Sequence, residues 1–251
     1  MSMNNKVVLV TGGSRGIGAA CARECAASGF DVVVNYTRDD AAAQAVAGAV
    51  RALGRRALVL QADVGDEAQV MAMFAAIDAE FGRLDALVNN AGIVDVKARL
   101  DEMDLARWER MLRINVIGSL LCAREAVKRM STRHGKAGGA IVNMSSVAAR
   151  IGAGGWYVDY AASKGAIDTF TLGLARELAA EGVRVNAVRP GIIDTDIHAS
   201  GGEPDRAWSS AALIPMQRPG TADEVAAAVG WLLSDAASYT TGTIVDVSGG
   251  R

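Results

Sequence analysis

Residues 6–18 read Lys-Val-Val-Leu-Val-Thr-Gly-Gly-Ser-Arg-Gly-Ile-Gly, and they join an apolar run directly to a glycine-rich turn. A continuous apolar run is typical of a parallel strand buried on both faces. The Ala-rich stretch that follows, as far as Ser28-Gly29, has the composition of a helix. Strand, glycine turn and helix form the frame of a phosphate-binding loop, because glycine lets the backbone approach a pyrophosphate and the helix N-terminus offers free N–H groups. A glycine-rich loop alone does not establish a nucleotide site.

The alternation of short apolar runs and helical stretches continues to the end of the chain, without internal repeat, low-complexity tract or linker. We predict strands at residues 6–10, 31–36, 56–61, 84–88, 140–144, 183–188 and 243–247. We predict helices after the glycine turn and at residues 40–53, 67–81, 104–133 (broken near 113–116), 161–178 and 222–233. This order predicts a single α/β domain over residues 1–251, with a Rossmann-type, doubly wound, seven-stranded parallel sheet and helices on both faces.

The composition excludes several classes of protein. Hydrophobic residues make up 51% of the 251 residues and charged residues 22%, which suits a globular domain with a large core. The formal net charge of −2 provides no basic footprint for nucleic acid. No apolar run approaches the roughly 20 residues that span a bilayer, so we expect no membrane partner. Residues 1–6 are polar and show no signal peptide, so we expect a cytoplasmic protein.

Few residues could bind a transition metal. The chain has three cysteines, Cys21, Cys25 and Cys122, and two histidines, His134 and His198. None of them forms a cluster with ligand spacing, so we predict no metal site. Cys21 and Cys25 lie four positions apart in the Ala-rich helix, where small buried packing residues are the simplest interpretation. Unpaired cysteines also fit a reducing compartment.

Tyr160 and Lys164 are candidates for acid–base chemistry. They lie four positions apart at the start of the helix predicted over residues 161–178, so they share one face. A nearby ammonium stabilises a phenolate and lowers the pKa of the phenol from about 10, which helps the phenol to exchange a proton with a substrate oxygen. The same spacing also occurs on amphipathic helices whose lysine lies in water, and the pair alone does not decide between the two.

The end of the second predicted strand bears on the choice of cofactor. In a Rossmann fold an acidic residue at this point binds the ribose 2′-OH of NAD, whereas basic residues accommodate the 2′-phosphate of NADP. Here the strand ends Asn35-Tyr36-Thr37-Arg38, and the first carboxylates, Asp39 and Asp40, are typical helix-start residues. The pattern favours NADP(H) over NAD(H).

Five motifs follow one another along essentially the whole chain. They are the turn with Thr11 and glycines at 12, 16 and 18, Asn89-Asn90-Ala91-Gly92, the mid-helix Asn115, Ser146 with Tyr160-x-x-x-Lys164, and Pro190-Gly191 followed by Thr195. In order and spacing they resemble the short-chain dehydrogenase/reductase family, in the branch whose members have roughly the length of this chain. Glucose 1-dehydrogenase-like and 3-ketoacyl-carrier-protein reductase-like members are the most similar groups.

The resemblance implies a catalytic set of Asn115, Ser146, Tyr160 and Lys164. Tyr160 is expected to be the general acid for reduction and the general base for oxidation. Lys164 is expected to lower the pKa of Tyr160 and to hold the nicotinamide ribose. Ser146 would polarise the carbonyl, and Asn115 would organise a water in a proton relay. Ser145 is the rival of Ser146, although the residues that follow favour Ser146.

The resemblance also implies cofactor contacts along the chain. Arg15, in the glycine turn, is expected to face the 2′-phosphate together with Arg38. Asp63 is expected to contact the adenine edge, although its spacing is equally consistent with a turn-forming role. The expected cofactor-binding residues are Gly12, Ser14, Arg15, Gly16, Ile17, Gly18, Asn35, Tyr36, Thr37, Arg38, Asp63, Val64, Asn90, Ala91, Gly92, Tyr160, Lys164, Pro190, Gly191, Ile193 and Thr195.

The activity implied by the resemblance is reversible hydride transfer between NADP(H) and a small carbonyl compound or secondary alcohol. Two related activities stay open: reduction of a 3-ketoacyl group on a carrier protein, and oxidation of a sugar such as glucose. Glu181 stands where carrier-docking members tend to have arginine, which argues against the first. A non-enzymatic NADP-binding redox sensor is the third alternative, and the intact Ser-Tyr-Lys set argues against it.

The substrate itself is not identified by the sequence. Residues 196–219 are the only sizeable stretch without clear periodicity, and long irregular segments often form lids, so we expect residues 191–219 to be a substrate lid within the single domain. We expect Trp156 and Tyr157 to line the substrate pocket. Family members are mostly tetramers, so a homotetramer is expected.

Overall fold

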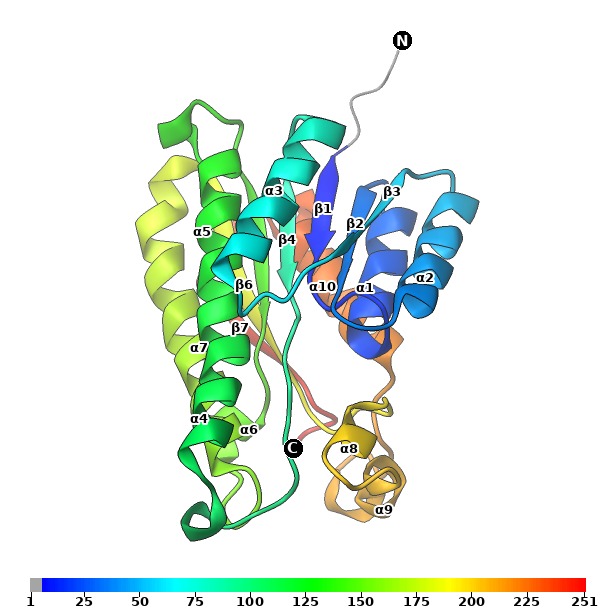
Figure 1. Ribbon diagram of the computed structural model, residues 1–251, viewed down its shortest axis with the longest axis vertical. Helices are drawn as coiled ribbons and strands as arrows, with labels where there is room; N and C mark the ends of the chain where they lie inside the picture. The colour runs from blue at the N-terminus through cyan, green and yellow to red at the C-terminus, as the bar shows by residue number, and fades with distance from the viewer. Residues whose placement is uncertain (1–5) are drawn as a thin grey trace.

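The computed structural model describes residues 6–251, and residues 1–5 of the predicted domain lie outside the described residues. Seven parallel strands form one sheet in the spatial order β3-β2-β1-β4-β5-β6-β7 (Figure 1). The strands are β1 (Val7–Val10), β2 (Asp31–Tyr36), β3 (Ala57–Gln61), β4 (Ala86–Asn89), β5 (Gly139–Met144), β6 (Val183–Pro190) and β7 (Ile244–Val247). The doubly wound parallel sheet predicted from the sequence is confirmed.

The direction of winding reverses between β1 and β4, which are hydrogen-bonded neighbours in the centre of the sheet. Val8 of β1 pairs with Val32 of β2 on one side and with Ala86 of β4 on the other. Chain segments leaving the carboxyl ends of β1 and β4 therefore turn to opposite faces of the sheet. A crevice forms at such a point, and in open α/β sheets it is where ligands bind.

Helices cover both faces of the sheet (Figure 1). One face packs against α1 (Gly16–Ala27), α2 (Asp40–Ala52) and α10 (Ala222–Leu233), and the other against α3 (Glu67–Phe81), α5 (Gly118–Met130) and α7 (Val158–Leu178). Alternate residues of β1 enter the two cores: Val8 and Val10 belong to the first, Val7 and Leu9 to the second, and all are buried. This two-sided burial is the physical reason for the unbroken apolar run at residues 6–10.

Side-chain caps set where several helices begin. Asp39 accepts a hydrogen bond from the Ala42 N–H at 2.9 Å, and Asp66 accepts one from the Gln69 N–H at 3.1 Å. Asp39 acts as the helix-start residue that the sequence predicted for α2, and Asp66 caps α3 in the same way. Thr221 and Glu224 form a capping box at the start of α10.

The helical region predicted over residues 104–133 is broken where expected, by a π-helical turn. It consists of α4 (Leu105–Leu112), the π turn η2 (Arg113–Ile117) and α5. Helix α7 starts at Val158, earlier than predicted, and the connection before it contains a short helix, α6 (Ala148–Ile151), that was not predicted. The Ser146 hydroxyl accepts a hydrogen bond from the Ala148 N–H at 3.1 Å, which starts this extra turn.

Residues 191–219 contain α8 (Ile197–Ser200), α9 (Arg206–Ser209) and the 3₁₀ turn η5 (Ala211–Leu213). These turns lie beyond the carboxyl ends of the strands (Figure 1). Ile192, Ala207 and Ile214 form a small core there that is separate from the two main cores. Further 3₁₀ turns are η1 (Leu100–Glu102), η3 (Thr132–His134), η4 (Ala179–Glu181) and η6 (Asp235–Ala237). Between residues 6 and 251, no helix is both long and apolar enough to cross a membrane.

Candidate active site

A cavity of about 430 Å³ lies at the carboxyl edge of the sheet. Its wall is formed by the start of α1, the residues that follow β4, β5 and β6, the first turns of α7, and the segment with α8 and α9. Of the residues predicted to form the site, it brings together Ile17, Asn90, Gly92, Ser146, Tyr160, Lys164, Pro190, Gly191, Ile193 and Thr195. Residues distant in sequence thus meet where a parallel sheet offers its binding crevice.

The glycine turn fits a dinucleotide pyrophosphate. Gly12 and Gly16 have φ angles of +59° and +51°, which favour glycine. A Cβ atom on Gly18 would lie 2.2 Å from the Gly12 carbonyl oxygen, so helix α1 packs directly on the turn. Helix α1 has no capping side chain and no acidic residue in its first turn. Its terminal N–H groups therefore remain for an anionic ligand.

The Asn89-Asn90-Ala91-Gly92 motif braces this turn. The Asn90 side chain donates hydrogen bonds to the Thr11 and Gly12 carbonyl oxygens at 2.9 and 3.1 Å. The backbone N–H groups of Asn90 and Ala91 both donate to the Thr11 hydroxyl at 3.0 Å. Asn89 donates to the Ser119 carbonyl oxygen at 2.8 Å, which ties the motif to α5. The motif thus holds the glycine turn at a fixed distance from the central strands.

The side chains of Asn35 and Tyr36, two predicted cofactor contacts, have structural partners. The buried Asn35 amide accepts a hydrogen bond from the Gly12 N–H at 3.2 Å and donates to the Ala62 carbonyl oxygen at 3.0 Å. The Tyr36 hydroxyl donates to Asp40 at 2.8 Å. These side chains brace the glycine turn and the start of α2, which leaves the residues after them to face a ligand.

Arg15, Thr37 and Arg38 are exposed beside the end of β2. The two nearest carboxylates are already engaged, since Asp39 caps α2 and Asp40 accepts the Tyr36 hydrogen bond. Across residues 6–251, neither Arg15 nor Arg38 has an ion-pair partner. Two unpaired guanidinium groups without a free acid at the strand end fit a 2′-phosphate.

Ser14 is half-buried in the glycine turn. Asp63 and Val64, two further predicted cofactor contacts, have structural roles. The Asp63 carboxylate accepts a hydrogen bond from the Gly65 N–H at 2.8 Å, which is the turn-forming role that its spacing allowed. Val64 is buried and packs tightly on α5, since a Cβ atom on Gly118 would lie 2.7 Å from its side chain. Contact of Asp63 with the adenine, and of Val64 with the cofactor, remains a prediction.

Asn115 is fully buried in the π turn and lies behind the cavity wall. Its amide oxygen accepts a hydrogen bond from the Ile93 N–H at 2.8 Å, and its amide nitrogen donates to the Ile93 carbonyl oxygen at 3.0 Å and to Ser163 Oγ at 3.1 Å. A Cβ atom on Gly92 would lie 3.3 Å from Asn115 Oδ1 and 3.5 Å from Lys164 Nζ. Asn115 thus holds the backbone next to Lys164.

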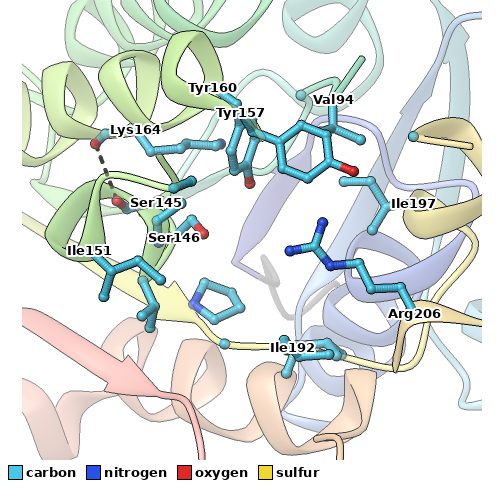
Figure 2. Close-up of a pocket in the computed structure, with 18 of the residues that line it drawn as sticks. Val94, Ser145, Ser146, Ile151, Tyr157, Tyr160, Lys164, Ile192, Ile197 and Arg206 are labelled. Atoms are coloured by element: carbon cyan, nitrogen blue, oxygen red, sulfur yellow. Dashed lines mark hydrogen bonds between the residues drawn. The ribbon is translucent and has the colours of Figure 1, made fainter. Parts of the chain in front are cut away.

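The two neighbouring serines differ in their hydrogen bonds (Figure 2). The buried Ser145 hydroxyl donates to the Lys164 carbonyl oxygen at 3.3 Å. Both serines line the cavity, and the Ser146 hydroxyl accepts a hydrogen bond from the Ala148 N–H and interacts with the Tyr160 phenol, whose pKa it lowers. This arrangement favours Ser146 over Ser145 as the hydroxyl available to a substrate oxygen.

The pKa of Tyr160 differs from the value expected for a phenol beside the Lys164 ammonium. Lys164 Nζ lies 5.7 Å from the centre of the Tyr160 ring and donates to the Met144 carbonyl oxygen at 2.7 Å. Burial lowers the pKa of Lys164 to about 8, against the opposing effect of Asp168. Burial also raises the pKa of Tyr160, outweighing the Ser146 hydrogen bond and the Arg206 charge, which lower it. The predicted lowering of the Tyr160 pKa is therefore wrong for the chain alone.

Sequence reasoning missed Arg206, which projects its guanidinium into the cavity (Figure 2). Its Cζ atom lies 4.8 Å from the centre of the Trp156 ring and 4.9 Å from that of Tyr157. Both aromatic residues line the cavity, as expected. Arg251 also lines it. Arg206 belongs to the segment without periodicity, so no sequence signal could have placed it there.

The three cysteines are buried free thiols. Burial raises the pKa of Cys21 and of Cys122 to about 12, so both are poor nucleophiles. Their burial confirms that Cys21 and Cys25 are packing residues of α1. Among the described residues, no group of three or more His, Cys, Asp or Glu side chains could hold a metal ion.

Comparison with known proteins gives concordant matches. A protein-family model described as Enoyl-(Acyl carrier protein) reductase matches residues 12–251. The chain is 56% identical over 245 residues to the uncharacterized oxidoreductase YgfF of Escherichia coli strain K12, covering 98% of this chain and 99% of that protein. It is 41% identical over 251 residues to 3beta-hydroxysteroid dehydrogenase 1 of Eggerthella lenta, covering 99% and 94%. The crystal structure of a short chain dehydrogenase from Burkholderia cenocepacia J2315 in complex with NADP matches with a TM-score of 0.90 at 38% identity, covering 98% and 97%.

Proposed function

Because the chain belongs to the short-chain dehydrogenase/reductase family, we propose that it transfers hydride reversibly between NADP(H) and a small carbonyl compound or secondary alcohol. Membership confirms the family that the five motifs predicted and makes the protein an oxidoreductase. One observation carries the proposal: the Ser146 hydroxyl, the Tyr160 phenol and the Lys164 side chain line one cavity that also reaches the start of α1 at Ile17.

The residues around the cavity suit a nicotinamide dinucleotide. When bound, NADP(H) supplies or accepts the hydride at the substrate carbon. We propose that the glycine turn and the start of α1 hold the pyrophosphate, and that Lys164 holds the nicotinamide ribose. The nicotinamide would lie against Pro190, Gly191, Ile193 and Thr195. The preference for NADP(H) over NAD(H) is supported by the unpaired Arg15 and Arg38.

Tyr160 is the proton donor of the proposed reduction. The substrate carbon gains the hydride while the carbonyl oxygen takes the phenolic proton, which yields the alcohol and oxidised cofactor; oxidation is the reverse. The raised pKa of Tyr160 keeps the phenol protonated at neutral pH, as a general acid requires. Ser146 donates a hydrogen bond to the same oxygen. The Lys164 ammonium stabilises the phenolate that remains.

Two further parts of the chain support this chemistry from outside the reacting atoms. Asn115 fixes the backbone at Gly92 and Ile93 against Lys164, and we propose that this positions the proton relay expected from the family resemblance. We propose that residues 191–219 form the substrate lid, which is supported by their small separate core and by their contribution to the cavity wall.

The test is consumption of NADPH and NADH over a panel of ketones, diketones, β-ketoesters and quinones, run beside Tyr160→Phe. We expect turnover with NADPH that is lost in Tyr160→Phe, while the affinity for NADPH stays nearly unchanged. A variant that keeps a substantial rate would remove Tyr160 from the mechanism. A preference for NADH would overturn the roles of Arg15 and Arg38.

The same panel separates the alternative functions. A 3-ketoacyl-carrier-protein reductase would reduce ketoacyl thioesters best. Glu181 argues against this activity, because it places a carboxylate where carrier-docking members tend to have arginine. That carboxylate accepts a hydrogen bond from Ser131. A sugar dehydrogenase would oxidise glucose with NADP. Tight NADPH binding without turnover of any carbonyl or alcohol would favour a redox sensor.

We also propose that the protein acts as a homotetramer in the cytoplasm. The assembly is supported by exposed apolar side chains on neighbouring helices, at Leu105, Leu112, Ile117, Leu120 and Leu172. The location is supported by the three unpaired thiols, which suit a reducing compartment.

A further inference from the structure

The charged side chains that line the cavity are all cationic. They belong to Lys164, Arg206 and Arg251, and no Asp or Glu side chain is among the described residues of the wall. Lys164 serves the proposed chemistry and donates to the Met144 carbonyl oxygen. The terminal carbonyl oxygen of Arg251 accepts a hydrogen bond from Ser248 at 3.1 Å and one from Arg150. Arg206 and Arg251 are thus the two cationic side chains at this end of the cavity.

Arg206 is held by aromatic faces and by an ion pair with Glu203, and its Nε donor is free within residues 6–251. Its guanidinium lies over the rings of Trp156 and Tyr157, and 17% of its side chain is exposed. Its Nε atom is buried and has no hydrogen-bond partner among the residues that the structure describes. The carboxylate of Glu203 is 3.7 Å away, beyond hydrogen-bond distance, and lies closer to Lys97, at 3.0 Å.

Two other arginines, the buried Arg107 and the half-buried Arg189, show how a guanidinium with a structural role is bonded. Arg107 donates to both carboxylate oxygens of Asp159, at 2.7 and 3.2 Å, and to the Val96 carbonyl oxygen at 2.7 Å. Arg189 donates twice to Asp168, at 2.8 and 3.0 Å. Arg206 has no comparable set of bonds. A buried guanidinium N–H without a hydrogen-bond partner, such as Arg206 Nε in the described part of the chain, is costly unless a ligand supplies one.

Much of the wall around Arg206 and the reacting groups is apolar. Val94, Ile151, Ile192 and Ile197 contribute to it, and Figure 2 shows Arg206 across the cavity from Ser146 and Lys164. A substrate that fills this space has its carbonyl at Ser146 and Tyr160, an apolar body along the isoleucines, and a group matched to a guanidinium at the far end. A carboxylate matches the fork of an arginine best.

We propose that the substrate is an oxo acid, or the corresponding hydroxy acid, whose carboxylate binds Arg206 across an apolar body. The inference rests on the proposed function, because it uses the same cavity and places the carbonyl at Ser146 and Tyr160. It makes Arg206 the residue that selects an anionic substrate over its neutral counterpart.

The test compares matched probes that differ only in charge. 4-Oxocyclohexanecarboxylate, its methyl ester and cyclohexanone are reduced with NADPH by the wild type, by Arg206→Gln and by Lys97→Gln. Lys97→Gln is the matched control, because it removes a cation of the same ionic cluster that does not line the cavity. We expect the wild type to favour the acid over the ester by about 10-fold or more in kcat/KM.

In Arg206→Gln we expect kcat/KM for the acid to fall about 10- to 100-fold, mainly through KM, while the value for the ester changes little. Lys97→Gln should keep the preference. Equal losses for acid and ester would make Arg206 a general influence on Tyr160 and overturn the proposal. So would a raised Kd for NADPH in Arg206→Gln, which would assign the guanidinium to the cofactor.

A binding measurement keeps the inference separate from the proposed activity. Calorimetry with NADP⁺ present would compare cyclohexanecarboxylate and hexanoate with their amides. Binding of the acids alone, lost in Arg206→Gln, would support the anionic site even if no probe is turned over, in which case only the proposed reaction fails. Turnover of neutral ketones without binding of either acid would overturn the anionic site and leave the reductase function intact.

Discussion

The charged residues near the cavity differ in whether a partner already holds them. Asp168 and Asp246 both contact Arg189, at 2.8 and 3.5 Å, whereas Arg15 and Arg38 extend into solvent with no ion-pair partner in residues 6–251. An arginine with a buried carboxylate is fixed in one geometry, and one without it can reach a ligand. Substitutions at the two kinds of position should therefore have different consequences.

Loss of the two exposed arginines should weaken the binding of NADPH but not that of NADH. In the double variant Arg15→Ala/Arg38→Ala we expect the Kd of NADPH to rise about 10- to 100-fold, because charge-assisted bonds to the 2′-phosphate are lost. The Kd of NADH should stay within about 2-fold, since its ribose carries no phosphate. Fluorescence titration of both cofactors measures this, and a parallel loss for the two would contradict the assignment.

The pH dependence of reduction should follow the protonation state of Lys164. Its pKa of about 8 lies below that of a free lysine, so the ammonium is present below pH 8 and is lost as the pH rises through that value. We expect kcat/KM to fall above about pH 8 for this reason. The Asp168 carboxylate raises the pKa of Lys164, so Asp168→Asn should move the fall to lower pH.

Asp246→Asn is the control for that profile. It removes a carboxylate from the same Arg189, but Asp246 does not contribute to the pKa of Lys164. The profile should keep its midpoint in this variant. A midpoint that moves equally in both variants would contradict the assignment of the alkaline limb to Lys164.

Two elements position the start of α7. Asp159 immediately precedes Tyr160, and its buried ion pair with Arg107 ties the first turn of α7 to α4. The π turn lies between α4 and α5 and carries Asn115, whose side chain binds the backbone of Ile93. These contacts fix the first turn of α7, and with it Tyr160, relative to the carboxyl ends of the strands.

The Asn115 side chain should matter for stability as well as for activity. Asn115→Ala removes its hydrogen bonds to Ile93 and Ser163 and leaves partly buried backbone groups unpaired, so we expect a loss of about 2–4 kcal/mol in the free energy of unfolding. Urea unfolding followed by circular dichroism measures the loss. Glu109→Ala, on the exposed side of α4, should change it by less than about 0.5 kcal/mol. Equal midpoints for the two variants would contradict this role of the π turn.

Sequence patterns predicted the elements that local physics determines. The two-sided burial of β1, the caps at Asp39 and Asp66, and the break near Asn115 all have signals within a few residues. The π geometry has no such signal, because Asn115 is held by Ile93, on another element. Arg206 had no signal either, since its place depends on how an irregular segment folds over Trp156 and Tyr157. The pKa of Tyr160 depends on burial, which residue spacing does not report.

For the molecule as a whole, the sheet separates two apolar cores and leaves the site at its carboxyl edge. Helices α5 and α7 lie on one side of the fold (Figure 1), and α4 contacts α7. Exposed leucines occur on all three of these helices. Exposed leucines on neighbouring helices favour association with a further copy.

We expect the protein in solution to have about four times the 26.0 kDa mass of one chain. The double variant Leu120→Arg/Leu172→Arg should lower the mass of the assembly in solution, because it places charge in the proposed contact between subunits. Leu53→Arg, on an exposed leucine that follows α2 on the opposite face, should leave the mass unchanged. Size-exclusion chromatography with light scattering measures all three, and a monomeric wild type at micromolar concentration would contradict the tetramer.

The small core of Ile192, Ala207 and Ile214 has a consequence for how this protein can diverge. Most side chains at residues 196–216 belong to neither main core, so substitutions there can accumulate with little loss of folding stability. Preference for new compounds can then be acquired by drift in one short segment while the hydride chemistry is inherited unchanged. A mutagenesis library confined to these positions would explore new substrates with few members lost to misfolding.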